Sequence, residues 1–311
     1  MAKRELNSRL EKLYDEGHEV YSISKLNTMA QCPYQAYLNY VKKEKSKPNA
    51  WALLGGNIHD ALQECVDTGC DTEIVRKSIE KELENLEFLG IDFPSESIRE
   101  NWIKNMTAFA DAFKTPDGKF ETEQFVLYKV SDDVWMQGYI DLLEYNEDGT
   151  VSIYDWKTSS KFTKDKLTEA GRQLILYALA KEQEGYKISK IAWRMLKYCK
   201  VRKQLKSGKI KESVMEWRKF EPGENIISVE PYIQEYEFSK ENIEETLNYM
   251  NKMIRKYQIY GEDEGAYDSC NINKNSYFCS NLCGYSNKCK WYRDYLEQRQ
   301  GETKDIDDDL F

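Results

Sequence analysis

The stretch Val151-Ser-Ile-Tyr-Asp-Trp-Lys-Thr158 reads as a β-strand, because its β-branched and aromatic residues favour an extended backbone. Asn146-Glu-Asp-Gly149 before it predicts a tight turn, and Trp135–Tyr145 predicts an antiparallel partner strand. Side chains alternate along a strand, so Asp155 and Lys157 share one face. A carboxylate and an ammonium group on a buried face are costly unless they are paired or used.

The partner strand carries one acid, Asp141, inside an apolar run. The hairpin brings Asp141 and Asp155 to one face, close enough to hold a divalent metal ion, with Lys157 beside them. Tyr154 and Trp156 point to the opposite face. Two interpretations of this stretch follow: a salt-bridged hairpin at the surface, or a metal-dependent active site.

The chain has 311 residues, of which 41% are hydrophobic and 32% charged, as expected for a folded soluble protein. No apolar run is long enough to span a membrane, and the N-terminus lacks the apolar region of a signal peptide. We therefore expect a cytoplasmic protein, and the abundance of Lys, Asn, Tyr and Ile hints at a bacterial or phage-infected cell. The net charge of -9 argues against a polycationic nucleic-acid binder but allows a local basic groove.

We expect a single domain over residues 1–300, followed by an acidic tail at 301–311. Within the domain we expect a helical lobe at about 22–115, a catalytic sheet core at 116–238, and a C-terminal helix with a cysteine cluster at 239–300. Hydrophobic periodicity predicts helices over 71–89, 94–113, 167–184 and 239–260, and strands over 121–130, 135–145, 151–158 and 188–196.

A histidine and a helical pair are further candidates for the site. Pro48 to Gly55 is expected to be a loop, and the glycine pair at its end opens a helix that carries His59 one turn in. His59 has two interpretations. It is an ordinary histidine of the core or the helix surface, or its side chain contacts a functional site against which the helix packs. Gln173 and Tyr177 are four residues apart on a predicted helix and therefore share a face.

Arg194 to Lys211 contains eight basic residues and no acidic one, with Ser207-Gly-Lys209 as a predicted hairpin tip. This segment is either a solvated loop or an arm that contacts phosphates. If basic residues here contact phosphates, we expect them to be Lys161, Arg172, Arg202, Lys203, Lys206 and Lys209.

Cysteines cluster near the C-terminal end of the chain. Cys279, Cys283 and Cys289 lie within eleven residues, which is typical of a metal site. Three thiols are one short of a full ligand set, so either Cys32 or Cys270 must complete it. A lone cysteine such as Cys32 is otherwise usually a small core residue.

Together these motifs resemble the PD-(D/E)xK nuclease superfamily, and within it the RecB/AddB-like branch with a four-cysteine iron–sulfur cluster, similar to the CRISPR-adaptation nucleases. The resemblance runs from about residue 22 to 295. The matching elements are Gly-x-x-x-His (His59), Gly-x-Ile-Asp (Asp141), Asp-x-Lys (Asp155, Lys157), Gln-x-x-x-Tyr (Gln173, Tyr177) and Cys-x-aromatic-x-x-x-Cys (Cys283 to Cys289).

The resemblance implies an α/β, restriction-endonuclease-like fold. A mixed central sheet would be flanked by helices, and an iron–sulfur cluster would tie an N-terminal helical lobe to the C-terminus. It implies a phosphodiester hydrolase, a metal-dependent DNA exonuclease that processes DNA ends in recombination, repair or replication. The implied catalytic residues are Asp141, Asp155, Lys157, Gln173 and Tyr177.

Two cofactors follow from the same resemblance. Mg²⁺ or Mn²⁺ would be held by His59, Asp141, Asp155 and the main-chain carbonyl of Trp156. A [4Fe–4S] cluster would be held by Cys32, Cys279, Cys283 and Cys289. The Cys279-x-x-x-Cys283 spacing is one residue longer than the commoner Cys-x-x-Cys, so Cys270 stays open as a substitute for Cys279.

Alternatives remain for function and for the tail. One alternative function is that of a nuclease that trims CRISPR spacer precursors. Another is that of a non-cleaving DNA-binding or scaffold subunit of a helicase–nuclease complex. Asp305–Phe311 resembles the acidic tip of bacterial single-stranded-DNA-binding proteins. This resemblance predicts that the tail binds a replication or recombination protein. The alternatives are that the tail folds back over the basic arm or that it is simply a solvated end.

Overall fold

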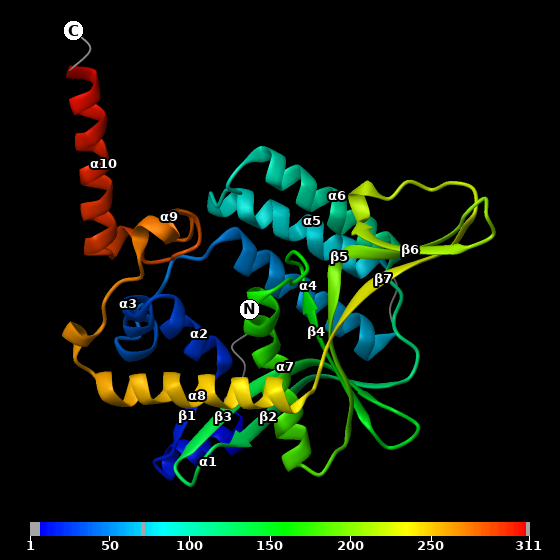
Figure 1. Ribbon diagram of the computed structural model, residues 1–311, viewed down its shortest axis with the longest axis horizontal. Helices are drawn as coiled ribbons and strands as arrows, with labels where there is room; N and C mark the ends of the chain where they lie inside the picture. Colours follow the sequence, from blue (N-terminus) through cyan, green and yellow to red (C-terminus); the bar gives the residue numbers. More distant parts are fainter. Residues whose placement is uncertain (1–6, 70–71, 309–311) are drawn as a thin grey trace. The chain divides into compact units, whose positions relative to one another are not determined.

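The computed structural model describes residues 7–69 and 72–308 (Figure 1). The chain forms two compact units. The first unit comprises Met1–Ile23 and Ala50–Asn248, and the second comprises Ser24–Asn49 and Tyr249–Phe311. Residues 24–49, which the sequence places in a helical lobe, thus belong to the same unit as the C-terminal region. The expected single domain over residues 1–300, with its internal boundaries, stays a prediction.

A mixed seven-stranded sheet forms the centre of the first unit, with strand order β1-β3-β4-β5-β6, while β2 pairs with β3 and β7 with β5. β3 and β4 form the expected antiparallel hairpin, and β4 and β5 are parallel. The strands are β1 (Glu19–Tyr21), β2 (Lys119–Lys129), β3 (Val134–Tyr145), β4 (Val151–Lys157), β5 (Ile188–Gln204), β6 (Ile210–Glu216) and β7 (Ile226–Tyr236).

Helices pack on both faces of this sheet. Tyr154 and Trp156 of β4 are buried in one apolar core with residues of α4, α5 and α6. The helix between β4 and β5, α7, packs on the opposite face, where Trp193 of β5 is fully buried. The helices of this unit are α1 (Ser8–Asp15), α4 (Ala50–Thr68), α5 (Thr72–Leu89), α6 (Glu96–Ala112), α7 (Asp165–Gln183) and the first part of α8 (Lys240–Tyr260). The predicted mixed sheet flanked by helices is confirmed.

The start of α4 differs from the prediction. The loop expected at Pro48 to Gly55 holds only for Pro48 and Asn49, and from Ala50 on the prediction is wrong, because α4 begins there and runs through the glycine pair. Ala50 and Leu54 are buried in the core, and this packing outweighs the roughly 1 kcal/mol by which each glycine disfavours a helix. His59 therefore lies near the middle of the helix instead of one turn into it.

Close packing fixes α7 on the sheet at Gly138 of β3. A Cβ atom built on Gly138 would lie 2.4 Å from Cε1 of Tyr177, a distance that real Cβ contacts essentially never show. Glycine is thus required at this position because the Tyr177 ring of α7 lies directly over the strand backbone. The Gly-x-Ile-Asp and Gln-x-x-x-Tyr motifs meet at this contact.

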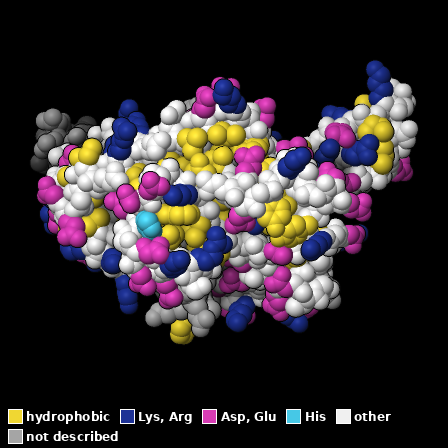
Figure 2. All heavy atoms as spheres, turned by 90° about the horizontal axis from the view of Figure 1, so that it is seen from below, with side chains coloured by type: hydrophobic (Ala, Val, Ile, Leu, Met, Phe, Trp, Pro, Cys, Tyr) yellow, Lys and Arg dark blue, Asp and Glu magenta, His cyan; other side chains and the backbone are white. Residues whose placement is uncertain are grey.

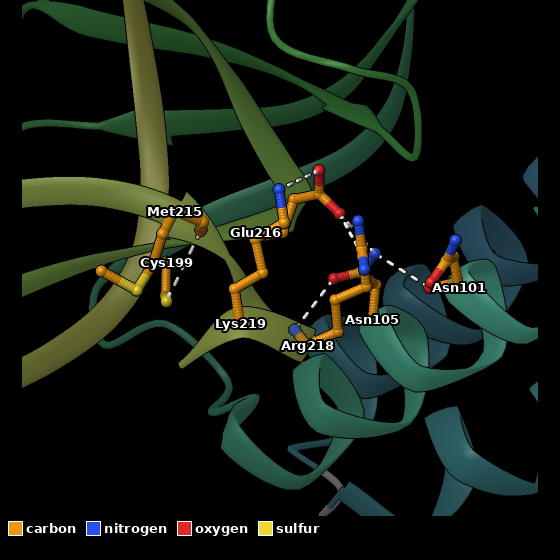
Figure 3. Close-up of polar contacts among 7 residues, drawn as sticks. All are labelled: Asn101, Asn105, Cys199, Met215, Glu216, Arg218 and Lys219. Atoms are coloured by element: carbon orange, nitrogen blue, oxygen red, sulfur yellow. Dashed lines mark hydrogen bonds and ion pairs between the residues drawn. The ribbon is translucent and has the colours of Figure 1, made fainter. Parts of the chain in front are cut away.

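A polar network fixes α6 to the end of β6 (Figure 3). The buried side chain of Asn105 donates to Glu216 Oε2 at 3.2 Å and to the Asn101 carbonyl at 2.9 Å, and it accepts the Arg218 amide at 3.0 Å. Arg218 Nε also donates to Glu216, at 2.6 Å. Burial alone would raise the pKa of Glu216, but the hydrogen bonds from Arg218 and Asn105 lower it. The network therefore anchors the end of the β5–β6 arm on α6.

The second unit joins two segments that are far apart in sequence. Tyr257 donates to the Lys25 carbonyl at 2.9 Å, and the Tyr34 amide donates to the Asp268 carbonyl at 3.0 Å. The helices α2 and α3 are separated at Cys32-Pro33, because Cys32 is the N-cap of α3 and the proline is its first residue. The elements are α2 (Ile23–Gln31), α3 (Pro33–Ala36), the π-helix η1 (Tyr37–Val41), the rest of α8, α9 (Ile272–Asn281), the 3₁₀ turns η3 (Glu264–Ala266) and η4 (Ser286–Lys288), and α10 (Lys290–Asp308).

In the described part of the chain, no helix combines the length and the apolar character needed to cross a membrane. The last described helix, α10, extends to Asp308. Residues 309–311 of the predicted acidic tail, which include the apolar Leu310 and Phe311, lie outside the described residues, so the role of that tail stays a prediction.

Replacing Gly138 with alanine is expected to lower the free energy of unfolding by about 1–3 kcal/mol, because the Tyr177 ring must shift to make room. Gly223→Ala is the control, since no atom lies within 4 Å of its added Cβ, and the change should stay within about 0.5 kcal/mol. Urea denaturation measures both. Equal effects of the two substitutions would contradict the close contact.

Replacing Asn105 with alanine leaves the Arg218 amide without its acceptor and removes one donor to Glu216, which keeps its bond to Arg218 Nε. The change should cost about 1–3 kcal/mol of stability. Asn101 is a matched control one helical turn away, because it takes part through its backbone carbonyl. Thermal or urea unfolding of Asn101→Ala should resemble the wild type. A similar loss in both variants would show that the side-chain network is unimportant.

Candidate functional site

The candidate site lies where the β3–β4 ladder ends. The last backbone pair is Leu142–Tyr154, so the next two residues, Asp141 and Asp155, follow the end of the ladder. Asp141 Oδ2 accepts the Trp156 amide at 2.8 Å. The side chain of Asp141 thus satisfies a backbone donor, and both aspartates are buried, at 8% and 2% exposure.

Lys157 connects the strand to the helix above it. Its Nζ lies 2.5 Å from Asp155 Oδ2 and donates to Gln173 Oε1 at 3.5 Å, which is a long hydrogen bond. Gln173 in turn donates to the hydroxyl of Tyr177 at 2.7 Å. The structure therefore brings together all five residues predicted to be catalytic, on β3, β4 and α7.

The charges of this group influence one another strongly. Burial alone would lower the pKa of Lys157, but the carboxylates of Asp155 and Asp141 outweigh it, so the pKa is raised. Burial also raises the pKa of the Tyr177 hydroxyl, and the same two carboxylates raise it further. As the group stands, the lysine is charged and the tyrosine is neutral, so Tyr177 serves as a hydrogen-bonding group.

His59 of α4 contacts the same group of residues from the opposite face of the sheet, on which α4 packs. Its Nδ1 lies 3.4 Å from Asp141 Oδ2, and its ring lies 5.9 Å from the Trp156 ring, edge on. Burial lowers the pKa of His59, despite the opposing charge of Asp155. A neutral imidazole has a free lone pair, which is the form that binds metals.

The donors present fit a hard divalent cation. Two carboxylates and a neutral imidazole are oxygen and nitrogen ligands that suit Mg²⁺ or Mn²⁺. Asp155 Oδ2 is buried and meets Lys157 as a close ion pair without an aligned hydrogen bond, so this oxygen has capacity for a further partner. Within residues 7–69 and 72–308, no three His, Cys, Asp or Glu side chains are close enough to hold a metal ion as they stand.

The residues predicted to contact DNA lie in different surroundings. Arg172 of α7 forms an ion pair with Glu245 at 2.7 Å, and Arg202 of β5 forms one with Glu212 at 3.1 Å. The sequence did not reveal either acidic partner, because both come from other elements. Lys161 is exposed in the β4–α7 connection, and Lys203, Lys206 and Lys209 are exposed at the β5–β6 hairpin, whose predicted turn is confirmed.

The predicted cluster cysteines all belong to the second unit. Cys32 and Cys279 are buried, while Cys283 and Cys289 are partly buried and flank η4. Burial raises the pKa of the thiols of Cys279, Cys283 and Cys289, and the charge of Cys32 raises all three further. A set of thiols is suitable chemistry for iron or zinc.

The loop between Cys283 and Cys289 is held by the N-terminal segment. Lys47 donates its amide to the Gly284 carbonyl at 3.1 Å, and a Cβ atom on Gly284 would lie 2.4 Å from the Lys47 carbonyl oxygen. The aromatic residue of the motif, Tyr285, is 2% exposed and donates to the Glu44 carbonyl at 2.7 Å. Glycine and tyrosine after Cys283 thus serve to fix this loop.

Comparison with known proteins gives one broad match. The family model described as "PD-(D/E)XK nuclease superfamily" matches residues 20–290. No curated protein matches the chain. Among solved structures, the one titled "Crystal structure of SSO0001" shares 14% identity, covers 91% of this chain and 93% of its own, and has a TM-score of 0.36, too low to support an argument.

The family match spans most of the chain and includes both strands and the helix that carry the candidate site. The chain belongs to the PD-(D/E)XK nuclease superfamily.

Proposed function

We propose that this protein is a metal-dependent DNA exonuclease that processes DNA ends in recombination, repair or replication in a bacterial or phage-infected cell. The observation that carries the proposal is the contact set at the end of the β3–β4 ladder. Asp141, Asp155 and Lys157 converge there, and Gln173 holds the lysine from α7. A merely structural salt-bridged hairpin needs neither the buried, incompletely bonded Asp155 oxygen nor His59 beside Asp141.

His59, Asp141, Asp155 and the Trp156 carbonyl would hold Mg²⁺ or Mn²⁺. When bound, such an ion supplies the positive charge that helps to activate water and to stabilise the departing oxygen of a phosphodiester. The Trp156 amide keeps the Asp141 carboxylate in one orientation, because it donates to Oδ2. This bond pre-orients the ligand before any ion binds.

The remaining side chains act on the phosphate and the attacking water. Lys157 presents its ammonium group at the site, where it orients the water and neutralises phosphate charge. Asp155 and Gln173 restrict the position of its Nζ. Tyr177 holds Gln173 through a 2.7 Å hydrogen bond, and Gly138 gives the tyrosine ring room to do so. Gln173 and Tyr177 are therefore the support for Lys157.

DNA binding is assigned to the β5–β6 hairpin rather than to the whole surface. On the face drawn in Figure 2, Lys and Arg side chains alternate with Asp and Glu instead of forming one basic field. From Lys203 to Lys211 the hairpin has four lysines and no acid. Such a local concentration of positive charge suits phosphate contacts in a protein of net charge -9. Arg202 and Arg172 are already paired with acids and would contribute less.

The second unit is proposed to hold a [4Fe–4S] cluster on Cys32, Cys279, Cys283 and Cys289, as in the RecB/AddB-like branch. The presence of all four cysteines in one unit supports this assignment, and so does the anchoring of the loop between Cys283 and Cys289 by Glu44 and Lys47. The cluster would connect Cys32 to a segment more than 200 positions later in the chain, so its role is structural.

Asp155→Asn and Lys157→Ala should each lower DNA cleavage by about 100-fold or more in Mg²⁺ or Mn²⁺, because charge and water positioning at the phosphate are lost. Glu147→Gln, in the exposed turn of the same hairpin, is the control and should cleave like the wild type. The assay uses end-labelled single and double strands beside closed circles, which an exonuclease leaves intact. Folded variants that keep activity within about tenfold of the wild type would refute the assignment.

Changing Lys203, Lys206 and Lys209 together to glutamate should weaken DNA binding. It should also reduce the slope of log affinity against log salt by up to about 2.7, since three phosphate contacts are lost. Binding is measured by fluorescence anisotropy with the Asp155→Asn protein, so that DNA stays intact. Lys77, Lys81 and Lys104, exposed on α5 and α6, provide the same charge change as a control. An unaltered slope in the hairpin variant would identify it as a solvated loop.

A further inference from the structure

A fifth thiol, that of Cys270, lies beside the four cysteines assigned to the cluster. Cys270 Sγ is 3.7 Å from Cys279 Sγ. The Cys270 amide also donates to Cys32 Sγ at 3.4 Å. One residue thus contacts two of the four sulfurs, one through its side chain and the other through its backbone.

The position of Cys270 is fixed by the structure around it. Three residues earlier, Tyr267 is 1% exposed and donates to the Gly261 carbonyl at 2.9 Å. Asp268 accepts the Tyr34 amide, which holds the segment against the turn that carries Cys32. Asn271, the next residue, is the N-cap of α9, the helix that bears Cys279. Cys270 therefore lies between two anchored points and stays close to Cys279.

The contact between the two sulfurs is a weak thiol hydrogen bond, in which either atom could be the donor. A thiol binds a metal only after it loses its proton.

The separation of the two sulfurs has a geometric consequence. With metal–sulfur bonds of about 2.3 Å, two thiolates on one tetrahedral ion lie about 3.8 Å apart. The 3.7 Å between the sulfurs of Cys270 and Cys279 matches the spacing of two ligands of a single ion. In a four-iron cluster each iron takes one cysteine, so these two residues compete for one iron instead of serving two.

We propose that Cys270 is a reserve ligand of the metal centre, which takes the place of Cys279 whenever that residue is not bound. The inference rests on the cluster assigned to the second unit under the proposed function. In the exchange, Cys270 releases its thiol proton as its sulfur binds the iron, and the sulfur of Cys279 takes up a proton as it leaves. No electron is transferred, so the exchange needs no oxidant or reductant.

The test uses the full chain, purified without oxygen, with alanine replacing single cysteines so that no new ligand atom is introduced. Iron and zinc contents, visible absorbance and thermal melting are measured for Cys279→Ala, Cys270→Ala and the double variant. Cys289→Ala is the matched control, because neither of the sulfur contacts of Cys270 involves Cys289. The wild type provides the baseline and is expected to hold about four irons per chain.

The proposal expects Cys279→Ala and Cys270→Ala each to keep nearly the wild-type metal content, while the double variant and Cys289→Ala lose it. Loss of metal in Cys279→Ala as complete as in Cys289→Ala would overturn the proposal. Metal loss in Cys270→Ala alone would also overturn it, because Cys270 would then be the resident ligand.

The metal content of the wild type distinguishes a failure of this proposal from a failure of the proposed iron–sulfur cluster. A wild type that holds zinc refutes the iron–sulfur cluster, while the variants still test the reserve ligand on zinc. A wild type without metal overturns both. Nuclease activity is independent of these readouts, since it is tested at Asp155 and Lys157 in the other unit.

Discussion

The candidate site depends on one hydrogen bond, from the Trp156 amide to the Asp141 carboxylate. Had the β3–β4 ladder continued by one pair, Asp141 and Asp155 would lie directly opposite each other, and like charges in that position destabilise a sheet. The strands instead stop pairing at Leu142 and Tyr154. Asp141 then accepts at 2.8 Å the amide that the ladder would otherwise have used.

The strand on the other side makes this arrangement stable. β4 stays paired with β5 as far as Lys157 and Met195, so Asp155 and Lys157 keep a rigid backbone although β3 has separated. Tyr154 and Trp156 fix the other face of this strand, because both are buried in the core that contains residues of α4, α5 and α6. At Asp141 and Asp155 the acidic centre is therefore not paired between β3 and β4, while β4 is fixed there by β5.

Much of this could be predicted from the sequence, because short-range patterns determine it. Alternation along Val151–Thr158, the turn at Asn146–Gly149 and the four-residue spacing of Gln173 and Tyr177 predict which side chains share a face. The sequence could not reveal long-range pairings such as Glu245 with Arg172, since no local pattern links residues 73 positions apart. It also missed β7, although Tyr232, Gln234 and Tyr236 alternate with charged or apolar neighbours, and Pro231 weakened that signal.

The second unit, built from residues 24–49 and from residues after 249, has a consequence for synthesis of the chain. Cys32 leaves the ribosome 238 residues before Cys270, which at ordinary elongation rates is roughly 10–50 s earlier. During this interval the nuclease sheet can form, while the N-terminal segment still lacks its packing partners. The second unit is therefore completed last. The second unit can be completed only in a chain that has been translated through Cys289. In a prematurely terminated product, the apolar residues of α2 and η1 stay uncovered.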